Sequence, residues 1–425
     1  MKRNSKHRSP IFIYLIAVVY AIIGSTLFYV FYLFGVFEYL PDNQTLLKWD
    51  SIWYDDLRAN GYSFLVGKMC NLAFFPAYPY LWRISGLQAI GISIVNSAVF
   101  LLSFTRIVVI TKLPLNYCLF LLTIPSFIFF FLPYSESFFL ASVTLVLWGY
   151  SRSASWAKFV GIFFCSTIRS IAFVFFPAFL VICVVVVIKG KNIKKEVIDT
   201  ICCLFSSLLG VVLVALLQYY ETGKWLYFLN VQAFWGRTWQ IPAFPLTTID
   251  PSQMLGIDSI AFTIGLICIF VICNLLTRYF TNRKLFQAQL AAFEEPIILS
   301  ILILAGTVIV DTCFTSVVDG HSNIWSINRH ILCTPFCIMF IVWWWKSDLD
   351  KVALIGIFVT VALGFLLTGL YGYPQHMLIF LLFFASLYIL KYQARYRLIV
   401  ALSCLIGLIL QLKLYDRFLH HLWVG

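Results

Sequence analysis

Long apolar runs separated by short polar stretches dominate the chain. The first run extends from Ile11 to Gly35. It is too long for the core of a signal peptide and lacks a small-residue cleavage site, so we expect it to remain as a span. Because a membrane-crossing helix needs about 20 mostly apolar residues, the pattern predicts an all-α polytopic membrane protein. Further spans are expected near residues 87–105, 115–133, 135–150, 198–219, 259–276, 296–316, 331–345, 352–370, 376–391 and 398–413.

The apolar run of residues 159–188 allows two topologies, since only Arg169 and Ser170 interrupt it. As one span, it would place the lysine cluster of residues 189–195 outside the cell. As two short segments hinged at Arg169, it keeps that cluster inside, together with the basic clusters near residues 278–284, 346–351 and 391–397. Basic loops are enriched on the cytosolic side of membrane proteins, which favours the hinge. With a basic, cytosolic N-terminus, this topology has about 13 membrane segments.

Composition supports the membrane assignment and narrows the range of partners. The 425 residues are 62% hydrophobic and 11% charged, whereas soluble domains average about 45–50% and about 25%. We therefore expect a single membrane domain over residues 1–425. The net charge of +12 is spread in short clusters between apolar runs, so no nucleic-acid partner is expected. The twelve cysteines lie mostly in apolar stretches and show no zinc-binding spacing, so no metal site is predicted from them.

Residues 36–85 form the first non-cytosolic loop in this topology, and they contain the strongest candidate for chemistry. Aromatic and polar residues alternate there, which predicts short helices on the membrane surface. Asp50, after Trp49, could act as a general base on a sugar hydroxyl. Alternatively, Asp50 or Ser51 could cap the start of a surface helix. The pair Asp55 and Asp56 fits a solvated helix face better than a divalent-ion site.

Other unusual residues fall on the same non-cytosolic face. Glu136 either opens a helix, where an acid suits the dipole, or orients a ligand or a basic partner. Arg169 either pairs with an acid such as Glu136 or binds a lipid phosphate. Arg329, beside His330, either snorkels to the interface or supplies a second phosphate-binding cation. Arg237 lies among tryptophans in the loop 221–258, which suits either an interfacial aromatic belt or contact with sugar and phosphate.

Several motifs together resemble the PIG-V-type mannosyltransferases, over about residues 45–180. They are Lys48-Trp49-Asp50, Gly61-Tyr62, Ala73-Phe74-Phe75-Pro76-Ala77-Tyr78-Pro79, Pro133-Tyr134-Ser135-Glu136-Ser137 and Ile168-Arg169-Ser170. The resemblance implies a GT-C type fold, an inverting transfer and a polyprenyl-phosphate sugar donor, with Asp50 at the position of the family's base. Lys48 replaces the arginine common in the family, so no phosphate role is assigned to it. The chain length is more similar to bacterial relatives, which implies a bacterial inner membrane, or the endoplasmic reticulum membrane in a eukaryote.

These observations predict a membrane glycosyltransferase, with mannose the favoured hexose. The donor is a polyprenyl-phosphate sugar, the acceptor is a lipid-linked or free glycan, and the surrounding partner is membrane lipid. Asp50 is the predicted catalytic residue. Neither a redox nor a nucleotide cofactor is implied, and a divalent metal is not required by the sequence. The predicted substrate-binding residues are Trp49, Glu136, Arg169, Arg237, Arg329 and His330. Two alternatives remain: a flippase for lipid-linked glycans, which would not account for the motif-rich outer loop, and a non-catalytic membrane subunit with this fold.

Overall fold

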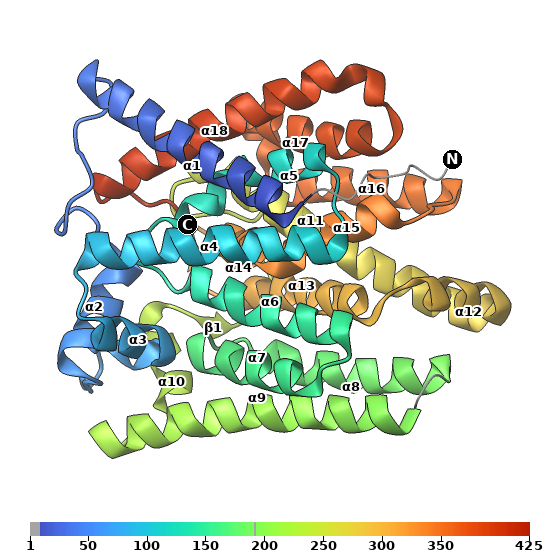
Figure 1. The fold of residues 1–425 in the computed structure, drawn as a ribbon, viewed down its shortest axis with the longest axis horizontal. Helices are drawn as coiled ribbons and strands as arrows, with labels where there is room; N and C mark the ends of the chain where they lie inside the picture. Colours follow the sequence, from blue (N-terminus) through green and yellow to red (C-terminus); the bar gives the residue numbers. More distant parts are fainter. Residues whose placement is uncertain (1–8, 191–192) are drawn as a thin grey trace.

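The computed structural model describes residues 9–190 and 193–425 as a bundle of helices (Figure 1). Within this part of the chain, eight helices are long and apolar enough to cross a membrane. This confirms an α-helical integral membrane protein, whereas the count of about 13 segments stays a prediction. The eight are α1 (Pro10–Leu33), α4 (Ala89–Thr111), α8 (Ala172–Lys189), α9 (Ile193–Thr222), α11 (Pro251–Thr281), α13 (Glu295–Cys313), α17 (Pro374–Tyr392) and α18 (Arg397–Leu419).

Shorter helices complete the bundle and its two ends. Beside the long helices lie α6 (Glu136–Arg152), α7 (Ser155–Ile168), α15 (Pro335–Lys346) and α16 (Lys351–Leu367). Figure 1 shows most of these helices lying roughly along one common axis, with their connections gathered at the two ends of the bundle. At one end lie α2 (Asp50–Asn60), α3 (Ala77–Ser85) and α10 (Tyr227–Asn230), and at the other lies α12 (Arg283–Ala292).

The helix break predicted at Arg169 is present. Helix α7 ends at Ile168 and α8 begins at Ala172. Both pack against α9. Lys158 forms an ion pair with Asp199, and further along both helices Ser166 Oγ lies 3.0 Å from Ser207 Oγ. Helices α7 and α9 therefore run in the same direction, and α8, which connects them in sequence, runs in the opposite direction. The end of α8 and the start of α9 therefore lie at the opposite end of the bundle from Arg169.

Two predicted spans are wrong as continuous helices. Residues 115–133 split into α5 (Leu115–Leu122) and the 3₁₀-helix η2 (Pro125–Phe130), because proline cannot donate the hydrogen bond that would continue α5. Residues 331–345 are likewise interrupted: the short α14 (Ile327–Ile331) ends before α15 begins at Pro335. The expected loop 221–258 is also too long, because α11 already begins at Pro251, a residue suited to a first helical turn.

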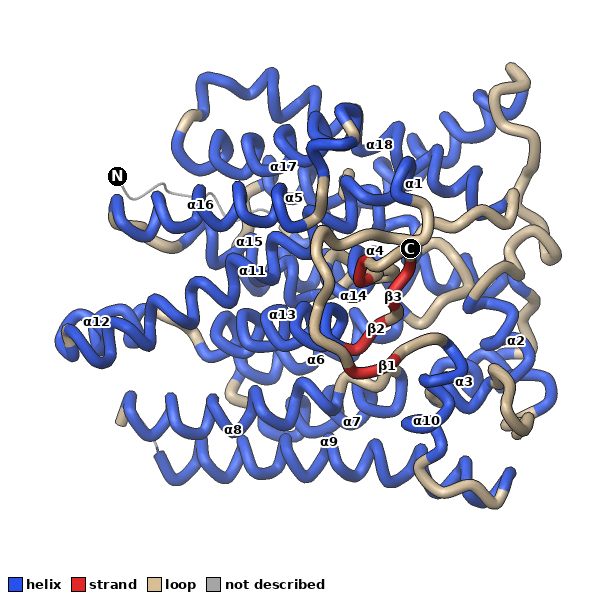
Figure 2. The backbone as a smooth tube through the Cα atoms, turned by 180° about the vertical axis from the view of Figure 1, so that it is seen from behind, coloured by secondary structure: helices blue, strands red, loops and turns tan. Residues whose placement is uncertain are grey.

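The strands in the described part of the chain are each two residues long. Strand β1 (Thr238–Trp239) pairs antiparallel with β2 (Phe314–Thr315), and β3 (Val317–Val318) pairs antiparallel with β4 (His321–Ser322). Figure 2 shows all of them on one side of the molecule, close to α14. His321 therefore lies in a strand. His376 is buried in α17, where Nε2 is 2.8 Å from the carbonyl oxygen of Ser252.

The segment of residues 36–85 contains short helices, as predicted, and contacts with distant segments fix it. It contains α2, the 3₁₀-helix η1 (Asn71–Ala73) and α3. Gly61 ends α2 with a φ of +77°, a conformation that favours glycine. The next backbone N–H, of Tyr62, donates to Glu221 Oε2 at 2.5 Å. Asn71 Nδ2 donates to Asp56 Oδ2 at 2.7 Å, so Asp56 stabilises the loop in addition to facing solvent.

Candidate functional site

The candidate site is a cavity of about 540 Å³ at the end of the bundle where α2 lies. It is lined by residues from the start of α2, the break between α7 and α8, residues 232–237, α14 and Trp423. The structure thus brings together segments as far apart in sequence as residues 49 and 423. Six of the seven predicted site residues line the cavity: Trp49, Asp50, Arg169, Arg237, Arg329 and His330.

Asp50 is the first residue of α2, but it does not cap that helix. Trp49 is the capping residue, with a φ of +53°, and no side-chain cap hydrogen bond is formed among the described residues. Ser51 Oγ instead accepts a hydrogen bond from the backbone N–H of Lys48 at 2.7 Å. The carboxylate of Asp50 accepts a hydrogen bond from Arg329 Nη2 at 2.5 Å. The capping interpretation of Asp50 was therefore wrong, and its side chain is directed to the other charged residues of the site.

Glu136 connects the two arginines behind the cavity surface. Its side chain is fully buried in the first turn of α6. Glu136 Oε1 lies 2.9 Å from Arg329 Nε and 3.2 Å from Arg169 Nη2. A buried carboxylate is costly unless opposite charges surround it, and two guanidinium groups together with the N-terminus of α6 meet that requirement. Asp50, Arg329, Glu136 and Arg169 thus form one alternating chain of charges.

Arg329 is the centre of this chain. Its guanidinium carbon lies 5.5 Å from the ring centroid of Phe129 and 5.2 Å from that of Tyr134. Burial by itself would lower the pKa of Arg329, but the charges of Asp50 and Glu136 hold that pKa well above its usual value. The group stays cationic, and aromatic rings and two carboxylates fix its position. A cation fixed in this way needs little reorganisation when an anion approaches.

His330 and Arg237 provide two further polar groups. His330 Nδ1 lies 2.9 Å from Asp311 Oδ2. Burial lowers the pKa of His330 below its usual 6.5, although Asp311 opposes the shift, so the ring is neutral at pH 7. If Nδ1–H donates to Asp311, Nε2 is left as an acceptor. Arg237 stacks on Trp325, with its guanidinium carbon 5.2 Å from the ring centroid.

An aromatic wall faces the charged residues. The rings of Trp53 and Phe74 stack at 6.3 Å, and Trp235 packs edge-on against both, at 5.3 Å and 5.6 Å. Trp49 packs against Trp423 at 5.1 Å. Such flat apolar faces beside polar groups suit a ring-shaped polar ligand. Two other tryptophans of the loop 221–258, Trp225 and Trp239, lie outside the cavity and are 51% and 70% exposed.

The sequence analysis missed two acids that support the site. Asp311 orients His330, as described above. Asp258, fully buried in α11, accepts hydrogen bonds at Oδ1 from Asn328 Nδ2 at 2.6 Å and from Asn328 N at 3.3 Å. It thereby holds the start of α14, one residue before Arg329. Both acids lie within apolar runs, where an ionisable residue is itself a signal of function, so the sequence did contain a sign of their role.

Compared with protein-family models, curated proteins and solved structures, the chain matches none of them. Among the described residues, no group of three or more His, Cys, Asp or Glu side chains is placed to hold a metal ion. The cavity therefore offers three arginines, a carboxylate, a neutral imidazole and an aromatic wall as its chemical resources.

Proposed function

We propose that this protein is an inverting glycosyltransferase that uses a polyprenyl-phosphate hexose, with mannose favoured by the resemblance to PIG-V-type enzymes. One observation carries the proposal: a single membrane-end cavity is lined by Asp50, Arg169, Arg237 and Arg329 and has an aromatic wall. Arginines suit a phosphate, aromatic faces suit a sugar ring, and the carboxylate suits a hydroxyl that must lose its proton. A polyprenyl-phosphate sugar and an acceptor alcohol need all three.

The proposed reaction uses the cavity's charges as follows. The acceptor oxygen attacks the anomeric carbon of the hexose and forms the new glycosidic bond. The bond from that carbon to the phosphate oxygen breaks, and its electron pair leaves with the phosphate. Asp50 takes the proton of the acceptor hydroxyl. The phosphate gains negative charge as it leaves, and Arg329 and Arg169 stabilise that charge in the transition state. His330 Nε2 accepts a hydrogen bond from a sugar hydroxyl.

The contact between Asp50 and Arg329 suggests how the donor prepares the base. In the structure Arg329 Nη2 binds the Asp50 carboxylate, so the oxygen that contacts Arg329 is not free to accept a proton from an acceptor hydroxyl. A donor phosphate competes for the same guanidinium group. When Arg329 turns to the phosphate, Glu136 still holds its Nε side, and Asp50 becomes free to accept a proton. Donor binding would therefore precede activation of the acceptor.

The cavity is assigned to the non-cytosolic face. The end of α8 and the start of α9, which contain lysines, and the segment of residues 278–284 lie at the opposite end of the bundle from α2. Basic ends of membrane helices are enriched in the cytosol. This supports a cytosolic N-terminus and a multi-pass location in the bacterial inner membrane, or in the endoplasmic reticulum membrane of a eukaryote.

The direct test is transfer by the purified protein in lipid vesicles. Polyprenyl-phosphate mannose carrying a radiolabel in the sugar is incubated with the vesicles and a membrane extract that supplies acceptors. We expect label to move from the donor to a new product, with release of polyprenyl phosphate. If the donor stays intact and a fluorescent lipid-linked oligosaccharide instead crosses the bilayer, the protein is a flippase. If neither occurs with glucose, mannose or galactose donors, the glycosyltransferase proposal fails.

A further inference from the structure

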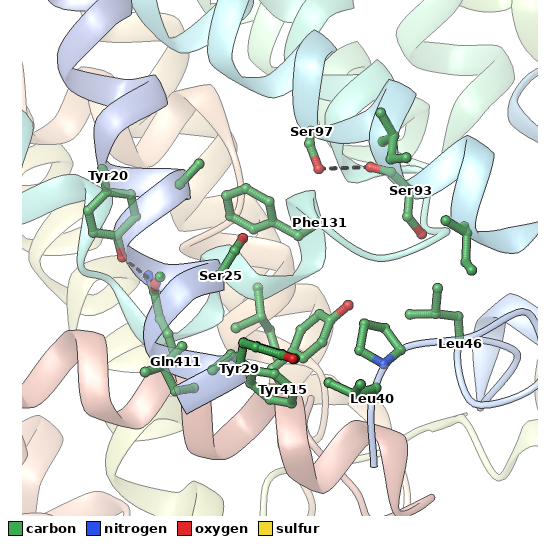
Figure 3. Close-up of a pocket in the computed structure, with 18 of the residues that line it drawn as sticks. Tyr20, Ser25, Tyr29, Leu40, Leu46, Ser93, Ser97, Phe131, Gln411 and Tyr415 are labelled. Carbon is green, nitrogen blue, oxygen red and sulfur yellow. Dashed lines mark hydrogen bonds between the residues drawn. The ribbon is translucent and has the colours of Figure 1, made fainter. Parts of the chain in front are cut away.

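A second cavity, separate from the charged one, opens on the side of the helix bundle. It is a groove of about 330 Å³ between α1, α4, η2 and α18, covered at one end by residues 40–46 (Figure 3). Its lining is mostly apolar, and no charged side chain among the described residues contributes to it. The groove shares no lining residue with the candidate site.

Hydrogen bonds close the groove at the end opposite residues 40–46, and the groove is open along its side. Tyr20 donates a hydrogen bond to Gln411 Oε1, and Gln411 Nε2 donates to the carbonyl oxygens of Leu122 and Ile124 at 2.7 Å and 2.6 Å. The first bond ties α1 to α18 at this end, and the other two tie α18 to the segment between α5 and η2. Along the open side, Tyr29 and Ile94 are 51% and 64% exposed. The groove is therefore continuous with the lipid-facing surface of two membrane-spanning helices.

One polar group in the groove lacks a partner. Ser93 is 7% exposed, and its hydroxyl has no hydrogen-bond partner in the described part of the chain. Its carbonyl oxygen is used, since it accepts from Ser97 Oγ at 2.8 Å. In Figure 3 the Ser93 hydroxyl points away from Ser97, toward the side of the groove where Leu46 lies. A buried hydroxyl without a partner is costly, which indicates that a ligand acceptor meets it.

We propose that this groove binds one acyl chain of a glycerolipid from the surrounding bilayer, with the Ser93 hydroxyl donating to the ester carbonyl of that chain. The apolar lining suits the hydrocarbon, and the buried hydroxyl of Ser93, which has no partner among the described residues, suits an uncharged acceptor. The absence of cations among the described lining residues does not suit a phosphate, which belongs with the arginines of the charged cavity. The occupant is thus an acyl lipid and not the proposed polyprenyl-phosphate donor.

A short backbone segment, from Leu46 to Ser51, links the groove to the charged cavity. Leu46 lines the groove and is 1% exposed. Its carbonyl oxygen accepts a hydrogen bond from Ser51 Oγ at 2.9 Å, and Ser51 follows Asp50. A lipid chain packed against Leu46 therefore supports the segment that places Asp50. This consequence rests on the proposed function, whereas lipid binding itself does not.

Photo-crosslinking tests the binding. The full protein is reconstituted in phosphatidylethanolamine vesicles that contain a phosphatidylethanolamine probe with a diazirine in one acyl chain, and labelled peptides are identified by mass spectrometry. We expect labels concentrated on the parts of α1, α4 and α18 that line the groove. Gly24 lies in the groove, and a side-chain carbon added to it would meet no other atom within 4 Å. Gly24→Phe should therefore place a ring in the groove, with its first side-chain carbon free of contacts, and reduce this labelling. Excluding as few as two methylene groups weakens binding by about tenfold or more.

Matched variants separate this from general effects on the helix. Ile22→Phe adds a ring on the lipid-facing side of the same helix, where Ile22 is 58% exposed, and should leave groove labelling unchanged. Ser93→Ala should weaken labelling by the ester-linked probe by about two- to tenfold, and should not weaken labelling by an ether-linked analogue.

Three results would overturn the proposal. They are equal labelling over all lipid-facing helices, equal effects of Gly24→Phe and Ile22→Phe, and displacement of the acyl probe by polyprenyl phosphate. The assay does not require transfer. If groove labelling is specific but the protein transfers no sugar, the lipid site stands and the proposed function fails.

Discussion

Replacing Asp50 with asparagine separates the catalytic interpretation from a structural one. Asparagine keeps the size of the side chain and one oxygen that can accept from Arg329 Nη2, now 2.5 Å from the carboxylate. What is lost is the negative charge and the ability to take a proton. Arg329 stays paired through Glu136 Oε1, 2.9 Å from its Nε, so no buried charge is left without a partner.

The expected losses in stability and in rate differ in size. Hydrogen bonds to charged groups contribute about 1.5–3 kcal/mol, and asparagine keeps one such bond to the cationic Arg329, so Asp50→Asn should lower the free energy of unfolding by less than about 1.5 kcal/mol. General-base assistance is worth about 10²–10⁴ in rate, which is about 3–5 kcal/mol of activation free energy. Turnover should therefore fall at least a hundredfold in a protein that still folds.

The assay is release of polyprenyl phosphate from a polyprenyl-phosphate hexose in vesicles, with thermal stability measured in parallel. Asp55→Asn is the matched control, because Asp55 forms only a partly exposed ion pair with Arg58 at 2.7 Å, worth about 0–1 kcal/mol. It should retain turnover. Wild-type turnover by Asp50→Asn would refute the general-base assignment, and equal losses in both variants would indicate a general defect of the outer loop.

Three further predictions follow from the charges and the helix directions. Glu136→Gln leaves two arginines without their shared buried carboxylate and should cost about 3–5 kcal/mol of stability, seen as a lower Tm; an unchanged Tm would contradict the buried ion cluster. The pKa of His330 is lowered in the folded protein, so the unfolded chain binds the proton first as pH falls. Its contribution to stability should be complete above pH 6.5, the usual pKa, and decline as pH falls through the folded-state value; His330→Gln should remove this part of the pH dependence. Cysteines introduced at Lys194 and Lys224 lie near opposite ends of the 30-residue α9, about 45 Å apart, so a membrane-impermeant thiol reagent should label Lys224→Cys only; labelling of both from one side would refute a membrane-spanning α9.

Local chemistry in the sequence was sufficient for several features of the fold. The length of the apolar runs predicted the membrane class, because a bilayer imposes a minimum length on any helix that crosses it. The break at Arg169 followed from the basic cluster after residue 188. The sequence was less informative about where helices end. Proline and short polar stretches split residues 115–133 and 331–345 in ways that average hydropathy does not resolve.

The site shows the same division. Asp50, Glu136, Arg169 and Arg329 stand out in the sequence because charged residues near lipid are costly and need a reason. The pair of Arg169 and Glu136 was predicted as one alternative and is present. The pairing of Asp50 with Arg329 could not be predicted, since the two are 279 residues apart and meet only when the helices pack. Asp258 and Asp311 acquire their roles solely through contacts with α14. The sequence by itself determined the membrane class and identified the unusual charged residues, because both follow from whether water or lipid surrounds each segment. Tertiary packing decided which charged residues meet, because the whole bundle sets the distances between helices that are far apart in sequence.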